Sequence, residues 1–514
     1  MDFSEKINLL MKMVHTTNFE LAETLDVDPS LISRWRTGER KVGTSSPYIA
    51  KIARFFAERI QEDFQKVAIL ELMGRHLEDK GVSKGDMVKF LTRWLLNEPY
   101  IDPESLTQLI NKIGNTANYY PKLEARPLPT EPKGRETYCE TFVGKEGLRA
   151  AAIKLLLQAT RKENSGKRCF LFSDEPMDWI GEDPEFANTW SYLLMSSIKN
   201  GIQIEIIHTL ERQQKELILA IEKWLPLYLT GSVKSYYYPA RRDDMFYNTS
   251  FTLEGVASIR GNAVRGEIDE NFTYDYVTEP EQLKKIEASF QLMKNKCDPL
   301  IKVYTDKIID EYSVHDISIF NNHDGDFLTL QSDPLSGMDN SLLKSFLLRG
   351  GISPTKAEEI IAYNDNKRED LREGISSKTF QLVMSLPRIT DVRKGIVPAL
   401  IPELLSGRTF FYTPEEYKAH LKNLISEMQK WDNFEVLLIP RKHIVQSVQL
   451  FVVKDKSMVV FKHTTPRLIF VSEQYDMVKA MESFITNMVS KIPKRNNNKE
   501  FVIESLTNFI AKIG

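Results

Sequence analysis

The stretch from Thr17 to Arg40, TNFELAETLDVDPSLISRWRTGER, constrains the fold of this chain more than any other segment. Its first half predicts a helix that begins after Thr17 as N-cap and carries Leu21 and Ala22 on one face. The small side chain of Ala22 allows a second helix to cross closely over the first. The stretch therefore predicts two short helices joined by a tight turn.

The second helix is predicted from its two ends. Asp28-Pro29-Ser30 supplies an N-cap with proline at the first helical position, and Gly38 is a helix stop. Helical spacing points Ile32 and Trp35 inward. It leaves a polar outer face made of Ser30, Ser33, Arg34 and Thr37. A further helix, residues 48–60, would complete a compact bundle.

These residues resemble the Cro and lambda-repressor class of helix-turn-helix domains, of the xenobiotic-response-element type, whose usual pattern is T-Q-x-E-L-A-x-x-L-G-V-S-x-x-x-I-S-x-W-E-x-G. Asn18 stands at the usual Gln, Asp26 at the usual Gly, and Arg36 where an acidic residue is common. Aspartate can adopt the left-handed backbone that this Gly position requires, so the frame is intact. The resemblance implies a domain that reads double-stranded DNA.

In this class the Gln contacts a phosphate or a base, and exposed residues of the second helix read base edges. The resemblance therefore assigns DNA contacts to Asn18, Ser30, Ser33, Arg34 and Thr37, while Arg36 and Arg40 suit phosphate contacts. Residues 34–54 hold six Lys or Arg against one acid, which is a local basic face. The alternative is a helical hairpin that serves as a protein interaction module.

Composition sets limits on the remainder of the chain. With 514 residues, 42% hydrophobic and 27% charged, the chain is long enough for three or four globular domains. Its net charge of −3 argues against coating nucleic acid along its whole length. The three cysteines have no second Cys or His at ligand spacing, so we predict neither a disulfide framework nor a metal site. No apolar run suits a signal peptide or membrane span, so we expect a cytoplasmic, bacterial-type protein without membrane contact.

The expected organisation is a multidomain chain with an all-α N-terminal part and a following α/β region. We place the helix-turn-helix domain at 1–62, a helical connector or dimer platform at 63–120, and a Pro-rich linker at 121–136. A first α/β lobe is expected at 137–310, a mostly helical connector at 311–400, and a second lobe at 401–514. Readers of this class bind paired half-sites, which favours a homodimer; the helices after the reader could instead cap the adjacent domain.

The two lobes echo each other in sequence. VTEPEQLKKIEASF (277–290) and VSEQYDMVKAMESF (471–484) share Val, Glu, Lys, Ser and Phe at one offset, so the α/β unit is either duplicated or matched by chance between amphipathic helices. The order of elements resembles the phospholipase-D-like fold, used by some sugar-responsive regulators as a catalytically dead sensor. Its active members need H-x-K-x-x-x-x-D in each lobe. No lysine stands two residues after His208 or His463. His420 is followed by this lysine but is predicted on a helix surface.

Few residues of the lobes suggest chemistry. No phosphate-binding glycine loop, dinucleotide fingerprint or nucleophile elbow occurs, so we expect neither an enzyme nor a cofactor. Asp174, Glu175 and Asp178 follow a strand and are interpreted as a solvated acidic loop; the alternative is a metal or ligand site, since open α/β sheets bind ligands at this edge. Ligand contact is assigned to His208, Tyr237 and Arg241, since aromatic faces and guanidinium groups suit an anionic or sugar-like molecule.

The sequence thus favours a sequence-specific transcriptional regulator whose α/β region senses a small-molecule or protein effector. Two alternatives remain open. One is an enzyme or defence effector that carries an autoregulatory or DNA-targeting helix-turn-helix head. The other is a protein-interaction adaptor.

Overall fold

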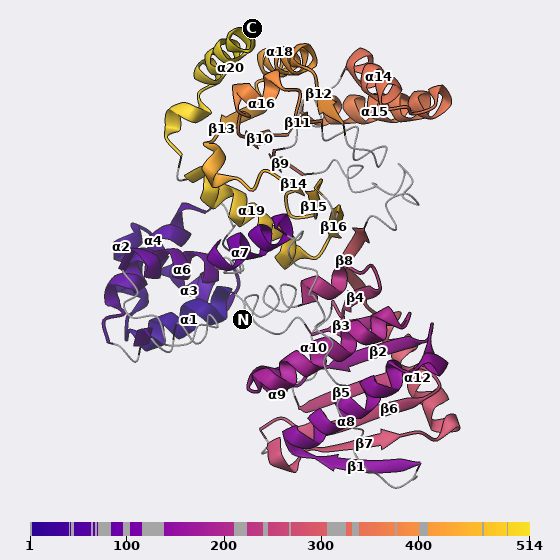
Figure 1. Cartoon of the computed structure of the whole chain (residues 1–514). Helices are drawn as coiled ribbons and strands as arrows, with labels where there is room; N and C mark the ends of the chain where they lie inside the picture. The colour runs from indigo at the N-terminus through magenta and orange to yellow at the C-terminus, as the bar shows by residue number, and fades with distance from the viewer. Residues whose placement is uncertain are drawn as a thin grey trace. The chain divides into compact units, whose positions relative to one another are not determined.

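The computed structural model describes residues 3–40, 42, 46–62, 65–66, 69, 84–95, 103–115, 138–209, 224–239, 245–266, 269–305, 325–331, 339–375, 378–399, 410–464, 467–490 and 492–514. These residues form two compact units, with the main boundary between Asp102 and Pro103. In the described residues, the first unit is helical, and the second contains a large mixed α/β sheet (Figure 1). The fold class predicted from sequence is confirmed.

The first unit, here called the head, is a helical bundle around one apolar core. Its helices are α1 (Phe3–Met13), α2 (Asn18–Leu25), α3 (Pro29–Thr37), α4 (Pro47–Arg59) and α6 (Lys84–Leu95). Ile32 and Trp35 of α3 are buried as predicted, in one cluster with Leu21 of α2, Ile52 of α4 and Leu91 of α6. Helix α6 therefore belongs to the core of the head.

Lobe 1 is the part of the second unit that spans residues 138–294. Its strands are β1 (Cys139–Val143), β2 (Arg168–Ser173), β3 (Gln203–His208), β4 (Val233–Tyr237), β5 (Phe246–Leu253), β6 (Ala257–Val264) and β7 (Thr273–Val277). They lie in the order β1-β7-β6-β5-β2-β3-β4. The strands β2, β3 and β4 are parallel, and the remaining neighbours are antiparallel.

Lobe 2 spans residues 298–514. Its strands are β8 (Asp298–Thr305), β9 (Phe327–Leu330), β10 (Phe380–Met384), β13 (Phe434–Leu438), β14 (Val448–Val453), β15 (Ser457–Lys462) and β16 (Leu468–Ser472). They lie in the order β8-β16-β15-β14-β9-β10-β13, with β9, β10 and β13 parallel and the others antiparallel. A separate two-stranded ribbon pairs β11 (Val397–Pro398) with β12 (Phe411–Tyr412).

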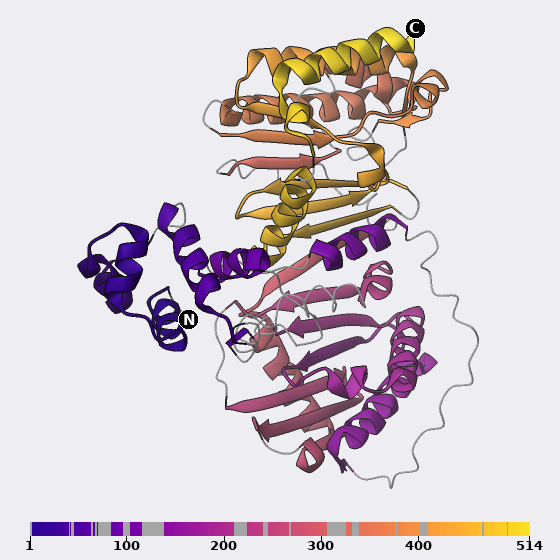
Figure 2. The ribbon, with the colours of Figure 1, turned by 90° about the vertical axis from the view of Figure 1, so that its left-hand side faces the viewer.

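Strand order and direction are therefore the same in both lobes. The matched segments 277–290 and 471–484 also occupy equivalent places, at the last strand of each lobe and the helix after it, α12 (Pro280–Lys294) or α19 (Tyr475–Ser490). Strand β8 pairs with β4 on one side and β16 on the other, so the lobes form one sheet of 14 strands among the described residues (Figure 2). The topology supports duplication over a chance match.

Parts of the expected organisation look different in the structure. The segment 311–400, expected as a mostly helical connector, holds helices α14 (Asn340–Arg349), α15 (Pro354–Ile375) and α16 (Ile389–Arg393) but also supplies β9 and β10 to the middle of lobe 2. After the head, α7 (Pro103–Gly114) packs on α19 and β14 of lobe 2. This packing agrees with the alternative that helices after the head cap the adjacent domain. The expected linker 121–136 lies outside the described residues.

Both faces of the lobe 1 sheet are covered. On one face Phe170 of β2 stacks on Phe290 of α12, with ring centroids 4.8 Å apart. On the other face Phe251 of β5 packs against Trp179 of α9 (Asp178–Gly181) and Trp190 of α10 (Pro184–Lys199), at 5.8 and 6.0 Å. Parallel strands buried on both faces have continuous apolar sequences, as CFLF in β2 does.

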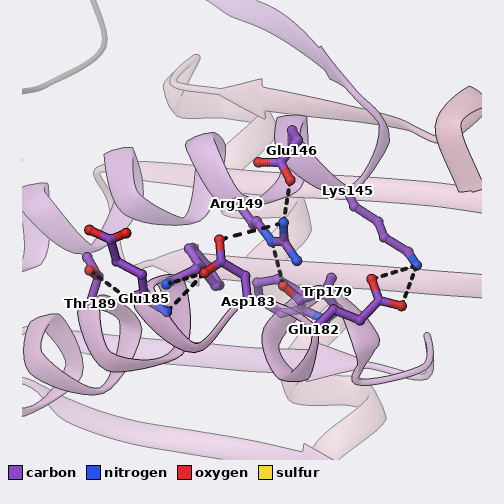
Figure 3. A network of polar contacts seen from close by, with 9 residues as sticks. Lys145, Glu146, Arg149, Trp179, Glu182, Asp183, Glu185 and Thr189 are labelled. Atoms are coloured by element: carbon purple, nitrogen blue, oxygen red, sulfur yellow. Dashed lines mark hydrogen bonds and ion pairs between the residues drawn. The ribbon is translucent and has the colours of Figure 1, made fainter.

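Buried Arg149 joins three helices of lobe 1 (Figure 3). It lies on α8 (Gly144–Ala159), and its Nε donates to the backbone carbonyl of Trp179 on α9 at 2.7 Å. Its guanidinium also contacts the carboxylates of Glu146 and Asp183. Asp183 in turn caps α10 by accepting from two backbone N–H groups. A charge-assisted hydrogen bond to α9 and an ion pair with the cap of α10 thus link these two helices to α8 through one rigid group.

Arg149→Ala should lower the free energy of unfolding by about 2–4 kcal/mol, because it leaves the buried Trp179 carbonyl and Asp183 without their cation. Urea unfolding followed by circular dichroism measures the change. Lys145→Ala is the control: its ion pair with Glu182, at 3.2 Å, is partly exposed and should contribute less than about 1 kcal/mol. Equal effects of the two variants would contradict this role of Arg149.

Candidate DNA interface

Side-chain caps position α2 and α3, the two helices of the predicted helix-turn-helix. The Thr17 hydroxyl accepts from the backbone N–H of Glu20, and the Glu20 carboxylate accepts from the backbone N–H of Thr17 at 2.8 Å, which forms a capping box at α2. Asp26 ends α2 with a φ of 56°, the left-handed conformation that the sequence requires at the usual glycine position. The turn therefore forms without glycine.

The second helix, α3, is fixed at both ends. The Asp28 carboxylate accepts from the backbone N–H of Ser30 at 2.8 Å, and Pro29 takes the first helical position. Gly38 ends the helix with a φ of 77°. Each end of α3 therefore lies where the sequence predicts it.

Between these ends α3 presents a polar, exposed face. Ser30, Ser33, Arg34 and Thr37 are exposed, and so is Arg40 in the loop that follows. Lys51 and Arg54 of α4 are exposed as well, which adds positive charge to the head. Lys41 lies outside the described residues. This exposed face can meet a DNA groove without any change of fold, since no core residue of α3 has to move.

Arg36 behaves differently from the other basic residues of the reader. It is half-buried, and its guanidinium donates to Oδ1 of Asn8 on α1 and Oδ1 of Asn18 on α2, each at 2.7 Å. The Asn8 amide donates back to the Arg36 backbone carbonyl at 2.9 Å. Arg36 thus links α1, α2 and α3 and holds the Asn18 side chain, while its phosphate contact stays a prediction. The sequence signal was the replacement of the usual acidic residue by Arg.

The ligand candidates of lobe 1 lie at the ends of parallel strands. His208 ends β3 and is paired in register with Tyr237 at the end of β4. His208 Nε2 lies 3.3 Å from the Tyr228 hydroxyl, and both His208 and Tyr237 are half-buried. Burial first, and then nearby carboxylates led by Asp298, raise the pKa of Tyr237, so its hydroxyl stays protonated. Arg241 lies outside the described residues.

Two acidic residues expected in solvent are buried instead. Asp174 accepts from the backbone N–H of Asn248 at 2.5 Å, and Glu175 accepts from the hydroxyls of Thr249 and, at 2.6 Å, Tyr274. Their polar atoms therefore stabilise the end of β2, while Asp178 is exposed. Within the described part of the chain, no group of three or more His, Cys, Asp or Glu side chains is arranged to hold a metal ion.

A comparison with solved structures matches this chain to TrmBL2, described as an archaeal chromatin protein with a novel mode of DNA binding. The match covers 46% of this chain and 81% of that chain, at 12% identity and a TM-score of 0.23. It is a distant structural similarity and carries no argument about function. No family model matches the sequence, and no curated protein does, so the chain receives no family assignment. None of the described helices has the length and apolar character that crossing a membrane demands.

Arg36→Ala should weaken the head by about 1–3 kcal/mol, because it removes the donor shared by Asn8 and Asn18. Hydrogen exchange of α2 and α3 amides in the full chain measures this local stability. The matched control is Arg40→Ala, whose exposed side chain should change protection by less than about 0.5 kcal/mol. Unchanged protection in Arg36→Ala would refute the structural link.

The capping carboxylates of Glu20 and Asp28 make the stability of α2 and α3 dependent on pH. Hydrogen bonds from the Thr17 backbone and the Thr16 hydroxyl lower the pKa of Glu20, and those from Ser30 lower the pKa of Asp28. A lowered folded-state pKa gives stability above the ordinary values of 4.5 and 3.8, and that stability is lost as pH falls through the folded-state values.

We therefore expect amides of α2 and α3 to be less protected in Glu20→Gln and Asp28→Asn than in the wild-type chain near neutral pH. The difference should shrink as pH falls below the ordinary values and through the lowered folded-state pKa values, where the wild-type carboxylates become protonated. Hydrogen exchange of wild type and variants at matched pH values measures it. A difference that is constant with pH would contradict the assignment.

Proposed function

We propose that the chain is a sequence-specific DNA-binding transcriptional regulator that reads double-stranded DNA with α3. The observation that carries the proposal is the exposed face of α3, made of Ser30, Ser33, Arg34 and Thr37. The opposite face of α3 is buried through Ile32 and Trp35, and side-chain caps fix the starts of α2 and α3. A helix of this kind fits the major groove, where each base pair has its own pattern of donors and acceptors. Arg34, with its forked guanidinium, suits bidentate contact to guanine.

The α/β region is proposed to sense an effector, and the protein to act as a homodimer on paired half-sites. An effector that binds one arrangement of two heads more tightly changes operator affinity by its differential binding energy, about 1–3 kcal/mol in typical allosteric proteins. The size of the α/β region supports a role beyond DNA reading, since only residues 1–62 are assigned to the reader.

Two other functions remain as alternatives. An enzyme or defence effector could carry the head for autoregulation or DNA targeting, with its chemistry in the lobes. A protein-interaction adaptor could use the same helices as a docking module. A protected symmetric DNA site would argue against the adaptor, and function that survives substitution of the acids and histidines of the lobes would argue against the enzyme.

The experiment that tests the proposal is selection of bound duplexes from a random library with the full-length protein. We expect one enriched motif with two half-sites about one helical turn apart, or a multiple of that spacing. Arg34→Ala should lose or relax the enriched positions. Absence of enrichment would overturn the proposal and favour the effector or adaptor functions.

Variants of the basic residues test their separate roles. Arg34→Ala should cost about 1–3 kcal/mol on the enriched duplex and relax specificity at one position, because it removes a base contact. Arg40→Ala should weaken all sequences alike and reduce the salt dependence, because it removes a phosphate contact. Fluorescence anisotropy at several salt concentrations measures both. Equal losses on all DNA from both variants would contradict a base-reading role for Arg34.

A further inference from the structure

Lobe 2 contains a cavity of about 320 Å³ at the carboxyl ends of its parallel strands. Gln331 follows β9, Ser385 follows β10, and Arg441 lies just after β13, and all three line the cavity. Open α/β sheets bind ligands at this edge. The volume is at the lower end of the range for small-molecule sites, which limits an occupant to one or two rings.

The floor of the cavity is a hydrogen-bonded group of three side chains. The backbone N–H of Ser385 donates to Gln331 Oε1 at 2.7 Å, and Gln331 Nε2 donates to the Ser385 hydroxyl at 3.1 Å. Gln446 Nε2 also donates to that hydroxyl, at 3.2 Å. Gln331 adopts a φ of 60°, a strained conformation for a residue other than glycine that is more common at functional sites.

This floor leaves specific polar atoms for a ligand. The Ser385 oxygen receives two hydrogen bonds, so its own hydrogen is a donor. The two hydrogens of the Gln446 amide nitrogen are shared among the Ser385 hydroxyl and the backbone carbonyls of Arg441 and Ile444, and its Oε1 is an acceptor. The hydroxyl donor of Ser385 and the amide acceptor of Gln446 therefore both belong to side chains of the cavity lining that are joined by a hydrogen bond.

The walls combine apolar and polar side chains, and Ser447, His463 and Thr464 are among the polar ones. Six side chains give hydrocarbon surface, namely Leu382, Met384, Pro387, Ile396, Val397 and Pro398. Tyr412, Tyr417 and His420 add aromatic surface, with the Tyr417 and His420 rings stacked at 5.8 Å. His420 is thus a half-buried wall residue, in contrast to the predicted surface position.

The charges of the lining cancel. Arg441 lies 3.9 Å from the Asp391 carboxylate, so the two neutralise each other. Burial, with a smaller effect of Lys462, lowers the pKa of His463 to about 4, so this lining residue is neutral at pH 7. Arg441 and Asp391, the basic and the acidic residue of the lining, therefore compensate each other.

These features favour a flat, uncharged ring over a sugar. A polyol has a hydroxyl on nearly every carbon, and those that face the six hydrocarbon side chains would lack partners, at a cost of about 1–3 kcal/mol each. A planar heterocycle has two apolar faces for the walls and a polar edge for the floor. Its edge can accept a hydrogen bond from the Ser385 hydroxyl and donate one to Gln446 Oε1.

We propose that this cavity binds a small, uncharged, nucleobase-like heterocycle, with its polar edge on Ser385 and Gln446 and its faces against the aliphatic and aromatic walls. The inference rests on the proposed function, in which the α/β region senses an effector, and it names the chemical class of that effector. It is independent of how the head reads DNA.

Isothermal titration calorimetry with the full chain and adenine, hypoxanthine, cytosine or uracil tests the site. At least one base should bind with a Kd below about 1 mM. Ser385→Ala, which removes the donor, should weaken binding at least about tenfold. Ile396→Trp should do the same by filling the cavity mouth; Ile396 is 52% exposed, so the fold can accommodate the larger ring.

Ser490→Ala, an exposed serine of α19 outside the cavity, is the matched control and should bind like wild type. Failure of all four bases to bind, tighter binding of glucose or acetate, or binding unaffected by both cavity variants would overturn the inference. DNA affinity is measured separately with the enriched duplex. If the protein binds an enriched duplex but none of the four free nucleobases, the cavity ligand alone is refuted. If it binds a free nucleobase but no duplex is enriched, the proposed regulator is refuted.

Discussion

The second unit depends on one strand, β8, which hydrogen-bonds to both lobes. Its first half pairs with β4 and its second half with β16, so residues 298–305 close two sheet edges at once. An open edge presents a row of unpaired backbone donors and acceptors, which is a hazard for aggregation. In lobe 2, β8 holds the place that β1 holds in lobe 1, where β1 pairs with β7 at the end of the sheet that the described strands form. The shared strand therefore turns two equivalent lobes into one sheet.

Equivalent places in the two lobes have diverged in chemistry. At the end of β2 in lobe 1, Glu175 is hydrogen-bonded to Thr249 and Tyr274 inside the fold. At the end of β9 in lobe 2, the first strand of the matching parallel set, Gln331 and Ser385 form the floor of a cavity. The same topology thus stabilises a strand end in one lobe and leaves space for a ligand in the other.

The helices α2 and α3 of the head could be predicted from sequence because their signals are local. Thr17, Asp28 and Gly38 act within a few residues of their own positions, and Ile32 and Trp35 follow the helical period. The role of Arg36 was missed because its partner Asn8 lies on another helix, 28 residues away. Helical spacing gives no information about such a contact.

In the lobes, the α/β class could be predicted from sequence, but the strands of the segment 311–400 could not. The runs FLTL and FQLVM, which form β9 and β10, cannot be distinguished by periodicity from parts of a helix, and the polar helices between them suggested a connector. The cavity was missed as a consequence. Its signal was a polar residue directly after each apolar run, Gln331 and Ser385, the same pattern that drew attention to Asp174.

The central claim, that the head reads DNA sequence, is tested most directly by a specificity ratio. The affinity of the full chain for the selected duplex is compared with that for a shuffled duplex of equal length, in competition at physiological salt. The account predicts a ratio of at least about 10³, the lower end for sequence-specific proteins. A ratio near one, with affinity set by salt alone, would show that the basic head binds phosphate without reading bases, and would contradict the account.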